Sequence, residues 1–473
     1  MGWSLLGMFF CIGCWFASPT PMQAQYPGDN AVCLSSGCAS TPNITNSHSF
    51  VDASQMPGID VCTKINAALK NLANNGGSTP LYANRGTIDA RGVSVSTLDC
   101  TVSQTSPWDG FNVNGSLKPP KATILLPAGT IKISKAWVLP EFTRVVGEGS
   151  CLSSTNCNLL TTIQAQSSLT TMIQLGNNIL CTPNTHSIYD CQATVIEHVR
   201  LDANSVATVQ QAILNNFAEE LSYVNDVAIV NLASGGVGLS LGSSSSNNAN
   251  NSGPYSNIYV SGNAATCVTI NGTNGTRGIH GLTCFESAGT GVAIKLDAPN
   301  NTLEDISIVT GIGTGAGSYQ DGILIGSVAS AENNVISNVT GVDNVTNLIH
   351  ICGPTGHVNC PSNSSTPPKD LSILAVTNSG GTTIYDELMG TTLRDSYVGM
   401  YLVGEPVVAG TVNGFTRFTT SASVPTWFEG PDAPAPNAGT CPIGSLYSRN
   451  TGSGITLWGC VNVGGSPSWQ PII

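Results

Sequence analysis

Apolar and polar residues alternate in short stretches through the middle of the chain. Residues 196–204 read IEHVRLDAN, so that the apolar residues Val199 and Leu201 separate the polar residues His198, Arg200 and Asp202. Successive side chains of a β-strand point to opposite faces. The pattern therefore predicts a short strand with its apolar side chains in a core and the three polar side chains in one outward row.

The same pattern recurs along the chain. Seven stretches align on one apolar anchor each: Val199, Val227, Ile258, Leu282, Ile306, Val339 and Leu371. They recur every 24 to 33 residues, and a second alternating stretch, such as GVAIKLD at residues 291–297, lies between successive anchors. Strands this short, separated by Gly, Asn and Ser, bury their apolar faces when they stack as coils of a solenoid. We predict an all-β parallel β-helix; a sandwich or jelly roll is the alternative.

Both ends of the repeats differ from the middle. Residues 59–77 predict an amphipathic helix that caps the solenoid, with Ile65, Ala68, Leu69 and Leu72 on one face. Near the C-terminus a stretch rich in Pro and Ala precedes two strands around a Thr-Gly-Ser-Gly turn, which predicts a small β-module. The expected parts are a signal peptide at 1–24, an extension at 25–56, the β-helix at 57–410, a linker at 411–439 and the module at 440–473.

Composition restricts the partners. The chain has 16 Lys and Arg against 28 Asp and Glu, a net charge of −12, and only 9% charged residues. Nucleic-acid binding needs clustered cations, so we exclude it, and tight charge-driven binding of polyanionic glycans is disfavoured. The apolar run at residues 3–17 is too short to span a bilayer and is typical of a signal peptide. We expect a secreted protein, extracellular or at the cell surface, without a membrane span.

The cysteines agree with export. Without Cys11 and Cys14 of the presequence, 14 of the 16 cysteines remain, an even number. Neighbours along the chain form the natural pairs Cys33–Cys38, Cys62–Cys100, Cys151–Cys157, Cys181–Cys191, Cys267–Cys284, Cys352–Cys360 and Cys441–Cys460. The sequence does not fix this connectivity. Since no spacing resembles a zinc site, we expect disulfides in an oxidising compartment, and no metal or cofactor.

The residue before each anchor forms a column on stacked strands: His198, Asp226, Asn257, Gly281, Asp305, Asn338 and Asp370. Asp and Asn tolerate the left-handed backbone conformation and bond neighbouring backbone groups, so the column predicts a polar ladder at the corners of the coils. A catalytic role for His198 and Asp226 is the alternative interpretation.

Arg200 and Asp202 lie past this corner. They form either a solvated face with a same-strand ion pair or one wall of a glycan groove. Tyr259 and Phe285 point outward on following coils, where exposed aromatic rings could stack on sugars. The alternative is that a long loop covers these two rings.

Three stretches near the N-terminus resemble one known family. The Ile-Asn-x-Ala helix at residues 65–68, LPAGTIKIS at 126–134 and WVLPEFTRVVGEG at 137–149 are similar to the entry of the pectate-lyase superfamily. The resemblance implies a right-handed parallel β-helix over about residues 57–150 and 190–390, and a carbohydrate substrate. Of the polygalacturonase motifs only GIHG, around His280, has a counterpart. The calcium-binding aspartates and arginine segment of pectate lyases have none, so we interpret His280 as a turn residue.

These observations lead to two hypotheses of function. The first is a polysaccharide hydrolase or lyase acting on a neutral or weakly charged glycan, with His198, Asp202 and Asp226 catalytic and Arg200, Tyr259 and Phe285 binding substrate. Hydrolysis needs two carboxylates on one face, and no pair of neighbouring coils clearly supplies both. The second hypothesis is a non-catalytic, adhesin-like protein that binds a polysaccharide or cell-surface glycan.

Overall fold

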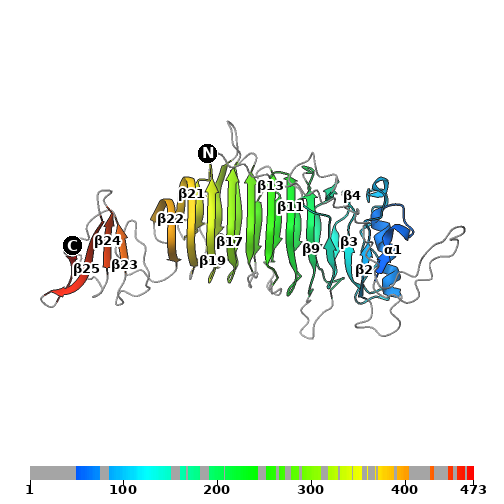
Figure 1. The fold of residues 1–473 in the computed structure, drawn as a ribbon, viewed down its shortest axis with the longest axis horizontal. Coiled ribbons are helices and arrows are strands. Elements are labelled where there is room, and N and C mark those ends of the chain that lie inside the picture. The colour runs from blue at the N-terminus through cyan, green and yellow to red at the C-terminus, as the bar shows by residue number, and fades with distance from the viewer. Residues whose placement is uncertain are drawn as a thin grey trace, which may run out of the picture. The chain divides into compact units, whose positions relative to one another are not determined.

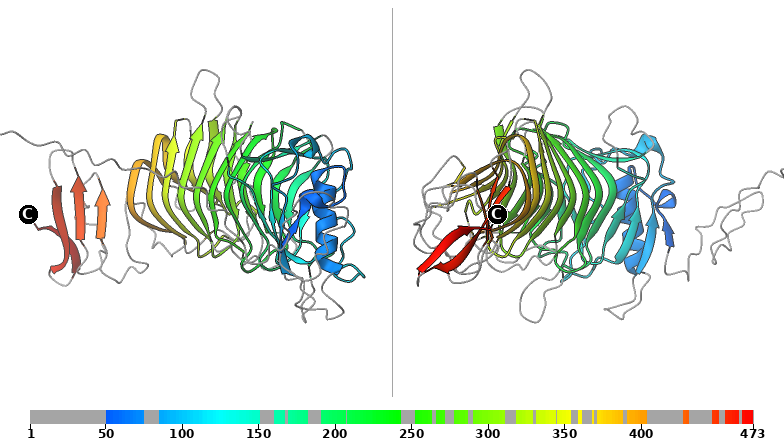
Figure 2. Two further views of the ribbon diagram at one scale, coloured as in Figure 1. Left: turned by 45° about the vertical axis from the view of Figure 1, so that its right-hand side comes forward. Right: turned by 60° about the vertical axis from the view of Figure 1, so that its left-hand side comes forward.

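Among the described residues, β-strands are the main secondary structure. The computed structural model describes residues 50–74, 85–150, 160–166, 169–181, 191–206, 208–242, 252–262, 266–271, 278–286, 290–310, 318–328, 331–343, 345–353, 359–360, 368, 371–387, 391–403, 427–430, 446–450, 455–463 and 466–472. One sheet contains 22 strands, and all but the last pair in parallel. Figures 1 and 2 show these strands stacked as successive coils, as expected for a parallel β-helix. Among the described residues, no helix has the length and hydropathy needed to cross a membrane.

The first coils are built from three short strands each. Strands β1 (Phe50–Asp52) and β2 (Arg85–Asp89) start the stack. Two full coils follow: β3 (Lys121–Leu125), β4 (Gly129–Ile133) and β5 (Trp137–Leu139), then β6 (Arg144–Val146), β7 (Thr161–Ala165) and β8 (Thr171–Leu175). Strands of corresponding position pair in register, so that β3 pairs with β6, β4 with β7 and β5 with β8. The coils therefore have three strand-bearing faces.

The middle coils fuse two of these faces into one strand. The first part of β9 (Val195–Asp202) pairs with β6 and its second part pairs with β7. Its row continues through β11 (Tyr223–Leu232), β13 (Tyr255–Gly262), β15 (Ile279–Glu286), β17 (Thr302–Thr310) and β19 (Val335–Val342). The third face holds β10 (Gln211–Asn215), β12 (Val237–Leu241), β14 (Thr266–Asn271), β16 (Thr290–Asp297), β18 (Ser318–Ile325) and β20 (Asn347–Ile351). Each long strand must consequently bend where one face turns into the next.

A long antiparallel pair ends the stack. Strand β21 (Leu371–Asp386) pairs with β19 over its first part and with β20 over its last. Strand β22 (Thr391–Val403) runs antiparallel along β21, so the parallel ladder stops there. A separate four-stranded sheet contains β23 (Trp427–Gly430), β24 (Leu446–Asn450), β25 (Ile455–Val463) and β26 (Ser466–Pro471). The antiparallel pairing of β24 with β25 confirms the predicted strands around the Thr-Gly-Ser-Gly turn.

The predicted capping helix is present as α1 (Val61–Asn74). Asp60 accepts a hydrogen bond from the Thr63 amide at 2.8 Å, which satisfies a free N–H of the first turn. The expected apolar face is buried, with Ile65 and Leu69 both at 0% exposure. This face packs on β1 and β2 at the N-terminal end of the stack (Figure 1). Short 3₁₀ segments, Ala53–Gln55 and Val95–Thr97, flank this region.

The anchors form the core in the register that the sequence pattern predicts. Val199 pairs with Val227, and the ladder continues through Ile258, Leu282, Ile306 and Val339. Each of these six side chains is at most 2% exposed. The seventh anchor was wrong, because Val339 pairs with Val376 rather than with Leu371. The predicted corner residue Asp370 lies outside the described residues, and Ala375 takes its place in the column.

Three of the expected disulfides are formed: Cys62–Cys100, Cys181–Cys191 and Cys352–Cys360. Cys460 is also disulfide-bonded, while its expected partner Cys441 and the pairs Cys33–Cys38 and Cys151–Cys157 lie outside the described residues. The pairing of Cys267 with Cys284 was wrong, since both are buried free thiols. Cys284 stacks between Val260 and Ile308 in a core ladder, so each thiol serves as a small apolar core residue.

Candidate functional site

The predicted corner column is confirmed by the backbone. The φ angle is 54° at His198, 50° at Asp226, 54° at Asn257, 68° at Gly281, 56° at Asp305, 52° at Asn338 and 48° at Ala375. All these residues are thus in the left-handed region that Asn, Asp and Gly tolerate best. The bend falls where β9 leaves the face of β6 for the face of β7. The column is therefore the edge between two faces of the solenoid.

Side chains along this edge bond to one another, which fits the predicted polar ladder. Asn257 donates to Asn225 of the preceding coil at 3.1 Å, and Asn338 donates to Asp305. His280 contacts Glu304 of the next coil at 3.0 Å between Nδ1 and Oε2. Asn257, Asp305 and Asn338 are all exposed. Solvent thus meets a row of amide, carboxylate and imidazole groups.

His198 and Asp226 form the first contact of this row. Their atoms Nδ1 and Oδ2 are 2.7 Å apart, and the side chains are 42% and 38% exposed. Ser150 donates a second hydrogen bond to Asp226 Oδ1 at 2.6 Å. Partial burial opposes ionisation of Asp226, but the hydrogen bonds from Ser150 and His198 outweigh it and lower its pKa. An ionised Asp226 holds the proton on Nδ1 of His198, which leaves Nε2 as the nitrogen able to accept a proton.

Arg200 and Asp202 do not form the exposed wall that we considered. They alternate with core residues as predicted, yet they are only 5% and 7% exposed. Arg200 Nη2 lies 3.5 Å from Asp202 Oδ2, which matches the same-strand ion pair. Asp202 Oδ1 accepts hydrogen bonds from the Asn204 amide and from Asn231 Nδ2, each at 2.8 Å. Asp202 thus braces the backbone beyond the corner, and a direct role in chemistry is not supported.

Tyr259 and Phe285 lie on the outer face of neighbouring strands. Tyr259 pairs with Thr283, and Phe285, two residues further along its strand, pairs with Ser261. Both aromatic side chains are half-buried. Burial raises the pKa of Tyr259, and a hydrogen bond with Ser261 opposes that shift. The two rings therefore present part of their surface among small hydroxyl residues, just past the corner column.

The carboxylates of the corner column itself are not brought together as a hydrolase pair. Asp226 and Asp305 occupy the same column, separated by the coils of Asn257 and Gly281. Three strand spacings of about 4.8 Å put them roughly 14 Å apart, beyond the roughly 5–9.5 Å that glycosidases use. Of the other carboxylates considered, Glu219 and Asp321 are buried, and the side chain of Glu286 lies outside the description. Among the described residues, two histidine–carboxylate contacts of this edge are accessible, His198 with Asp226 and His280 with Glu304.

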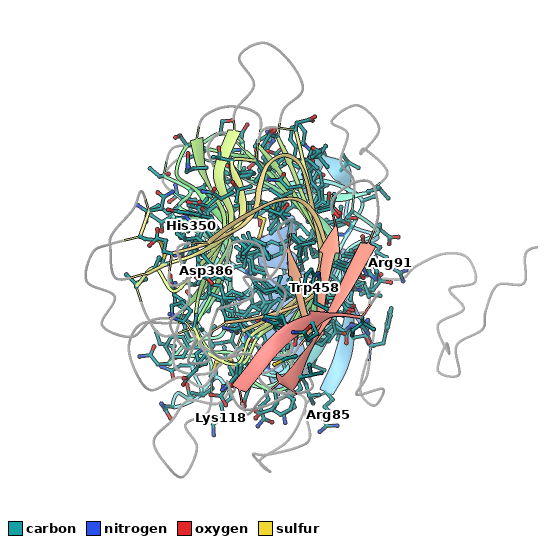
Figure 3. The ribbon with its side chains drawn as sticks, turned by 90° about the vertical axis from the view of Figure 1, so that its left-hand side faces the viewer. Arg85, Arg91, Lys118, His350, Asp386 and Trp458 are labelled. Carbon is teal, nitrogen blue, oxygen red and sulfur yellow. A yellow bond between two sulfur atoms is a disulfide. The ribbon has the colours of Figure 1, made fainter. Side chains whose placement is uncertain are left out.

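The sequence pattern missed a buried cluster at the C-terminal coils. His350 alternates with the core residues Ile349 and Ile351 of β20, so its ring lies on the outer face, yet it is 2% exposed. Its Nδ1 lies 2.7 Å from Asp321 Oδ1 of β18, and its Nε2 lies 2.8 Å from Glu387 Oε1 beyond β21. Figure 3 shows His350 at the periphery of the coils. Three successive coils are thus tied together by one ring.

Neighbouring groups cover and hold this cluster. Asn347 and Asn359 donate to the two oxygens of Asp321 at 3.0 and 2.7 Å. The Gly353 amide donates to Glu387 Oε2 at 2.7 Å. Burial opposes protonation of His350, but Asp321 and then Glu387 outweigh it, so its pKa is raised.

A local signal for this cluster does exist in the sequence. A histidine between two isoleucines in NLIHICG places an ionisable side chain inside an apolar strand. Such a side chain needs a partner when it is covered. The partners at 321 and 387 are far away in sequence, so only the stacking of the coils identifies them.

Comparisons with known proteins add little to this geometry. No protein-family model matches the chain, and no curated protein matches it. Among solved structures, ORF18 of Geobacillus virus E2 is similar with 11% sequence identity and a TM-score of 0.30, over 89% of this chain and 76% of that chain. A similarity at this level supports neither a family nor a function.

Proposed function

We propose that this protein is a secreted, carbohydrate-active β-helix protein whose corner edge and adjoining outer face bind a neutral or weakly charged glycan. The observation that carries the proposal is the row of exposed amides and carboxylates running beside the half-buried rings of Tyr259 and Phe285. Sugars are bound by aromatic rings under their apolar face and by hydrogen bonds at their rim. The right-handed coil and the kinship with the pectate-lyase superfamily belong to this proposal.

Two general properties agree with it. A net charge of −12 with only 16 cationic residues disfavours anionic glycans. Disulfides among the described residues, and no membrane-spanning helix there, are compatible with an extracellular location. Glycan binding without turnover needs no further group, so binding is the activity that this edge supports best.

Turnover is the second candidate, because one specific contact favours it. The hydrogen-bonded pair of His198 and Asp226 is accessible to solvent. The ionised carboxylate of Asp226 accepts the hydrogen bond from Nδ1 of His198, so that Nε2 is free to act as a general base. Asp226 would orient and stabilise the imidazolium that forms. Asp202 and Arg200 take no part in this proposal, because they are only 7% and 5% exposed.

Affinity electrophoresis against a panel of neutral polysaccharides tests the binding proposal. We expect Tyr259→Ala and Phe285→Ala each to weaken glycan binding about fivefold or more, since stacking on one ring contributes on the order of 1 kcal/mol or more. Phe50→Ala, at an exposed ring on β1, is the matched control and should bind like the wild type. Equal binding of all four proteins would show that the glycan face lies elsewhere.

Product formation separates turnover from binding. New reducing ends alone would indicate a hydrolase, and ultraviolet absorbance from unsaturated products would indicate a lyase. If turnover occurs at this edge, His198→Ala should abolish it while glycan retardation persists. If His198→Ala forms product as fast as the wild type, His198 and Asp226 are not the catalytic groups.

A further inference from the structure

Three different metal-ligating side chains converge at the buried C-terminal cluster. His350, Cys360 and Glu387 each offer one ligand atom, and these atoms lie within 4.8 Å of one another. His350 Nε2 lies 3.5 Å from Cys360 Sγ and 2.8 Å from Glu387 Oε1. Cys352 is bonded to Cys360, so its sulfur lies 2.05 Å from Cys360 Sγ. One sulfur, one imidazole nitrogen and one carboxylate oxygen therefore converge, and a second sulfur is one covalent bond away.

These separations are close to the edges of a tetrahedral site. With Zn–N near 2.0 Å and Zn–S near 2.3 Å, tetrahedral geometry puts nitrogen and sulfur about 3.6 Å apart and nitrogen and oxygen about 3.3 Å apart. The nitrogen–sulfur distance already fits. For an ion to bind, His350 Nε2 and Glu387 Oε1 have to move apart by roughly 0.5 Å.

The surroundings have the features of a prepared metal site. Asp321 accepts from Nδ1 of His350, which fixes the ring so that Nε2 faces Glu387 and Cys360. Carboxylate–histidine–metal arrangements of this kind orient the ligand and raise its basicity. Asn347 and Asn359 hold Asp321, and the Gly353 amide holds the second oxygen of Glu387. Both ligands are thus supported by partners that are not ligands themselves.

We propose that the Cys352–Cys360 disulfide masks a site for one Zn²⁺-class cation, formed by His350, Glu387 and the two cysteines once that disulfide is reduced. A dithiol reductant supplies two electrons and two protons: the sulfur–sulfur bond breaks, two cysteine thiols form, and the dithiol becomes a disulfide. The separated sulfurs can then reach the roughly 3.8 Å that a tetrahedral ion requires. Binding of the ion displaces the thiol protons.

In either redox state the region stays tied together. In the oxidised protein the disulfide ties Cys352, just after β20, to Cys360, and the hydrogen bond of His350 to Glu387 joins β20 to the end of β21. In the reduced protein the cation makes the same connection. Cys352 and Cys360 pack on Val292 and Leu324 and so cover the outer face there. A covalent bond in the oxidised protein, or a metal ion in the reduced protein, therefore holds this cover in place. No motif spacing in the sequence indicates the site, because its four ligands are spread over positions 350, 352, 360 and 387.

Titration of the full chain with Co²⁺, followed by competition with Zn²⁺, tests the proposal. The protein is reduced with a dithiol, freed of it under anaerobic conditions, and compared with the oxidised form. We expect one Co²⁺ per reduced chain with intense thiolate-to-cobalt absorption, and no such band in the oxidised chain. Asp321→Asn, which replaces the acceptor of the His350 Nδ1 hydrogen bond and leaves all four ligands in place, should weaken binding about 10–100-fold.

The variant Cys352→Ala with Cys360→Ala is the matched control, because it keeps the free thiols of Cys267 and Cys284. The thiolate band should vanish in this variant. Cys352→Ser frees the Cys360 thiol without any reductant and should show a weaker band. The proposal is overturned if the double variant gives the same band as reduced wild type, or if reduced protein loses its β-sheet circular dichroism or binds no Co²⁺.

Discussion

At the scale of single residues, the corner of each coil is decided by backbone conformation. A left-handed residue with a side chain costs about 1–2 kcal/mol, which Asn, Asp and Gly reduce. Six of the seven corner positions hold His, Asp, Asn or Gly, and the seventh holds Ala375 at φ 48°. Alanine has neither a polar side chain to bond the backbone nor the freedom of glycine. Ala375 is therefore a strained, exposed position.

We predict that Ala375→Gly stabilises the protein. Relief of about 1–2 kcal/mol of strain exceeds the entropic cost of glycine, about 0.5–1 kcal/mol. The free energy of unfolding from urea titration should rise by about 0.5–1 kcal/mol. Ala136→Gly, at a position of ordinary φ, is the control and should lower stability by a similar amount. A loss of stability in Ala375→Gly would contradict the assigned corner.

Asp226 should make stability depend on acid pH. Its folded pKa is lowered, so its contribution is present above the ordinary value of about 4 and is lost as the pH falls through the folded value. The difference in Tm between wild type and Asp226→Asn should therefore be largest near neutral pH and shrink below about pH 4. A difference that stays constant from neutral to strongly acidic pH would refute the ionised contact with Ser150 and His198.

At the scale of elements, large and small residues alternate across the core. A Cβ on Gly322 of β18 would lie 2.5 Å from the Leu348 carbonyl and 2.9 Å from Ile308 Cδ1. A Cβ on Gly238 of β12 would lie 2.6 Å from Val260 Cγ1. The third-face strands thus approach the long strands so closely that only glycine fits at these points. The narrow core depends on these contacts.

Gly322→Ala should consequently destabilise the fold by about 1–3 kcal/mol, the usual cost of overpacking. The contact with a backbone carbonyl prevents relief by a side-chain rotation. Gly92→Ala is the control, because its added Cβ would make only contacts of 3.4 Å or more with Ser54. Urea titrations of both variants check the prediction, and equal stability of the two would show that the coils can separate there.

The free thiols offer a test of the same core. Cys267 and Cys284 are buried, and burial raises the pKa of Cys284. We expect neither thiol to react with an alkylating reagent in the folded protein, and both to react after unfolding in denaturant. Peptide mapping locates the label. Protection of both thiols even in denaturant without reductant would show that they form a disulfide after all.

The elements also show what the sequence could and could not reveal. Six anchors and their corner residues were predictable, because period-two alternation and Asn or Asp before the anchor are local signals. The prediction of the last anchor was wrong because Leu371 lies at the start of β21, whereas the strand bends later, at Ala375. Alternation also predicts the face of Arg200 and Asp202 but not what covers that face, so their burial was missed. The cluster of His350 depends on coils that only tertiary stacking brings together.

At the scale of the whole molecule, the solenoid is a scaffold that repeats one edge many times. Each coil adds a polar corner, and the corners stack at the strand spacing of about 4.8 Å. Such an edge can contact successive units of a linear polymer, as a single pocket cannot. The buried cluster at β20 and β21 stabilises the opposite end of the stack from α1 and takes no part in this contact. Glycan recognition and the proposed metal site are therefore separable.

The glycan-binding face is tested by affinity electrophoresis of the wild type, Tyr259→Ala and Phe285→Ala across neutral and acidic polysaccharides. We expect at least one neutral or weakly charged polysaccharide to retard the wild type, and both variants to lose that retardation. We expect no comparable retardation by strongly acidic polysaccharides, given the net charge of −12. Two results would contradict a glycan-binding face on this edge: no polysaccharide retards the wild type, or both variants are retarded as strongly as the wild type.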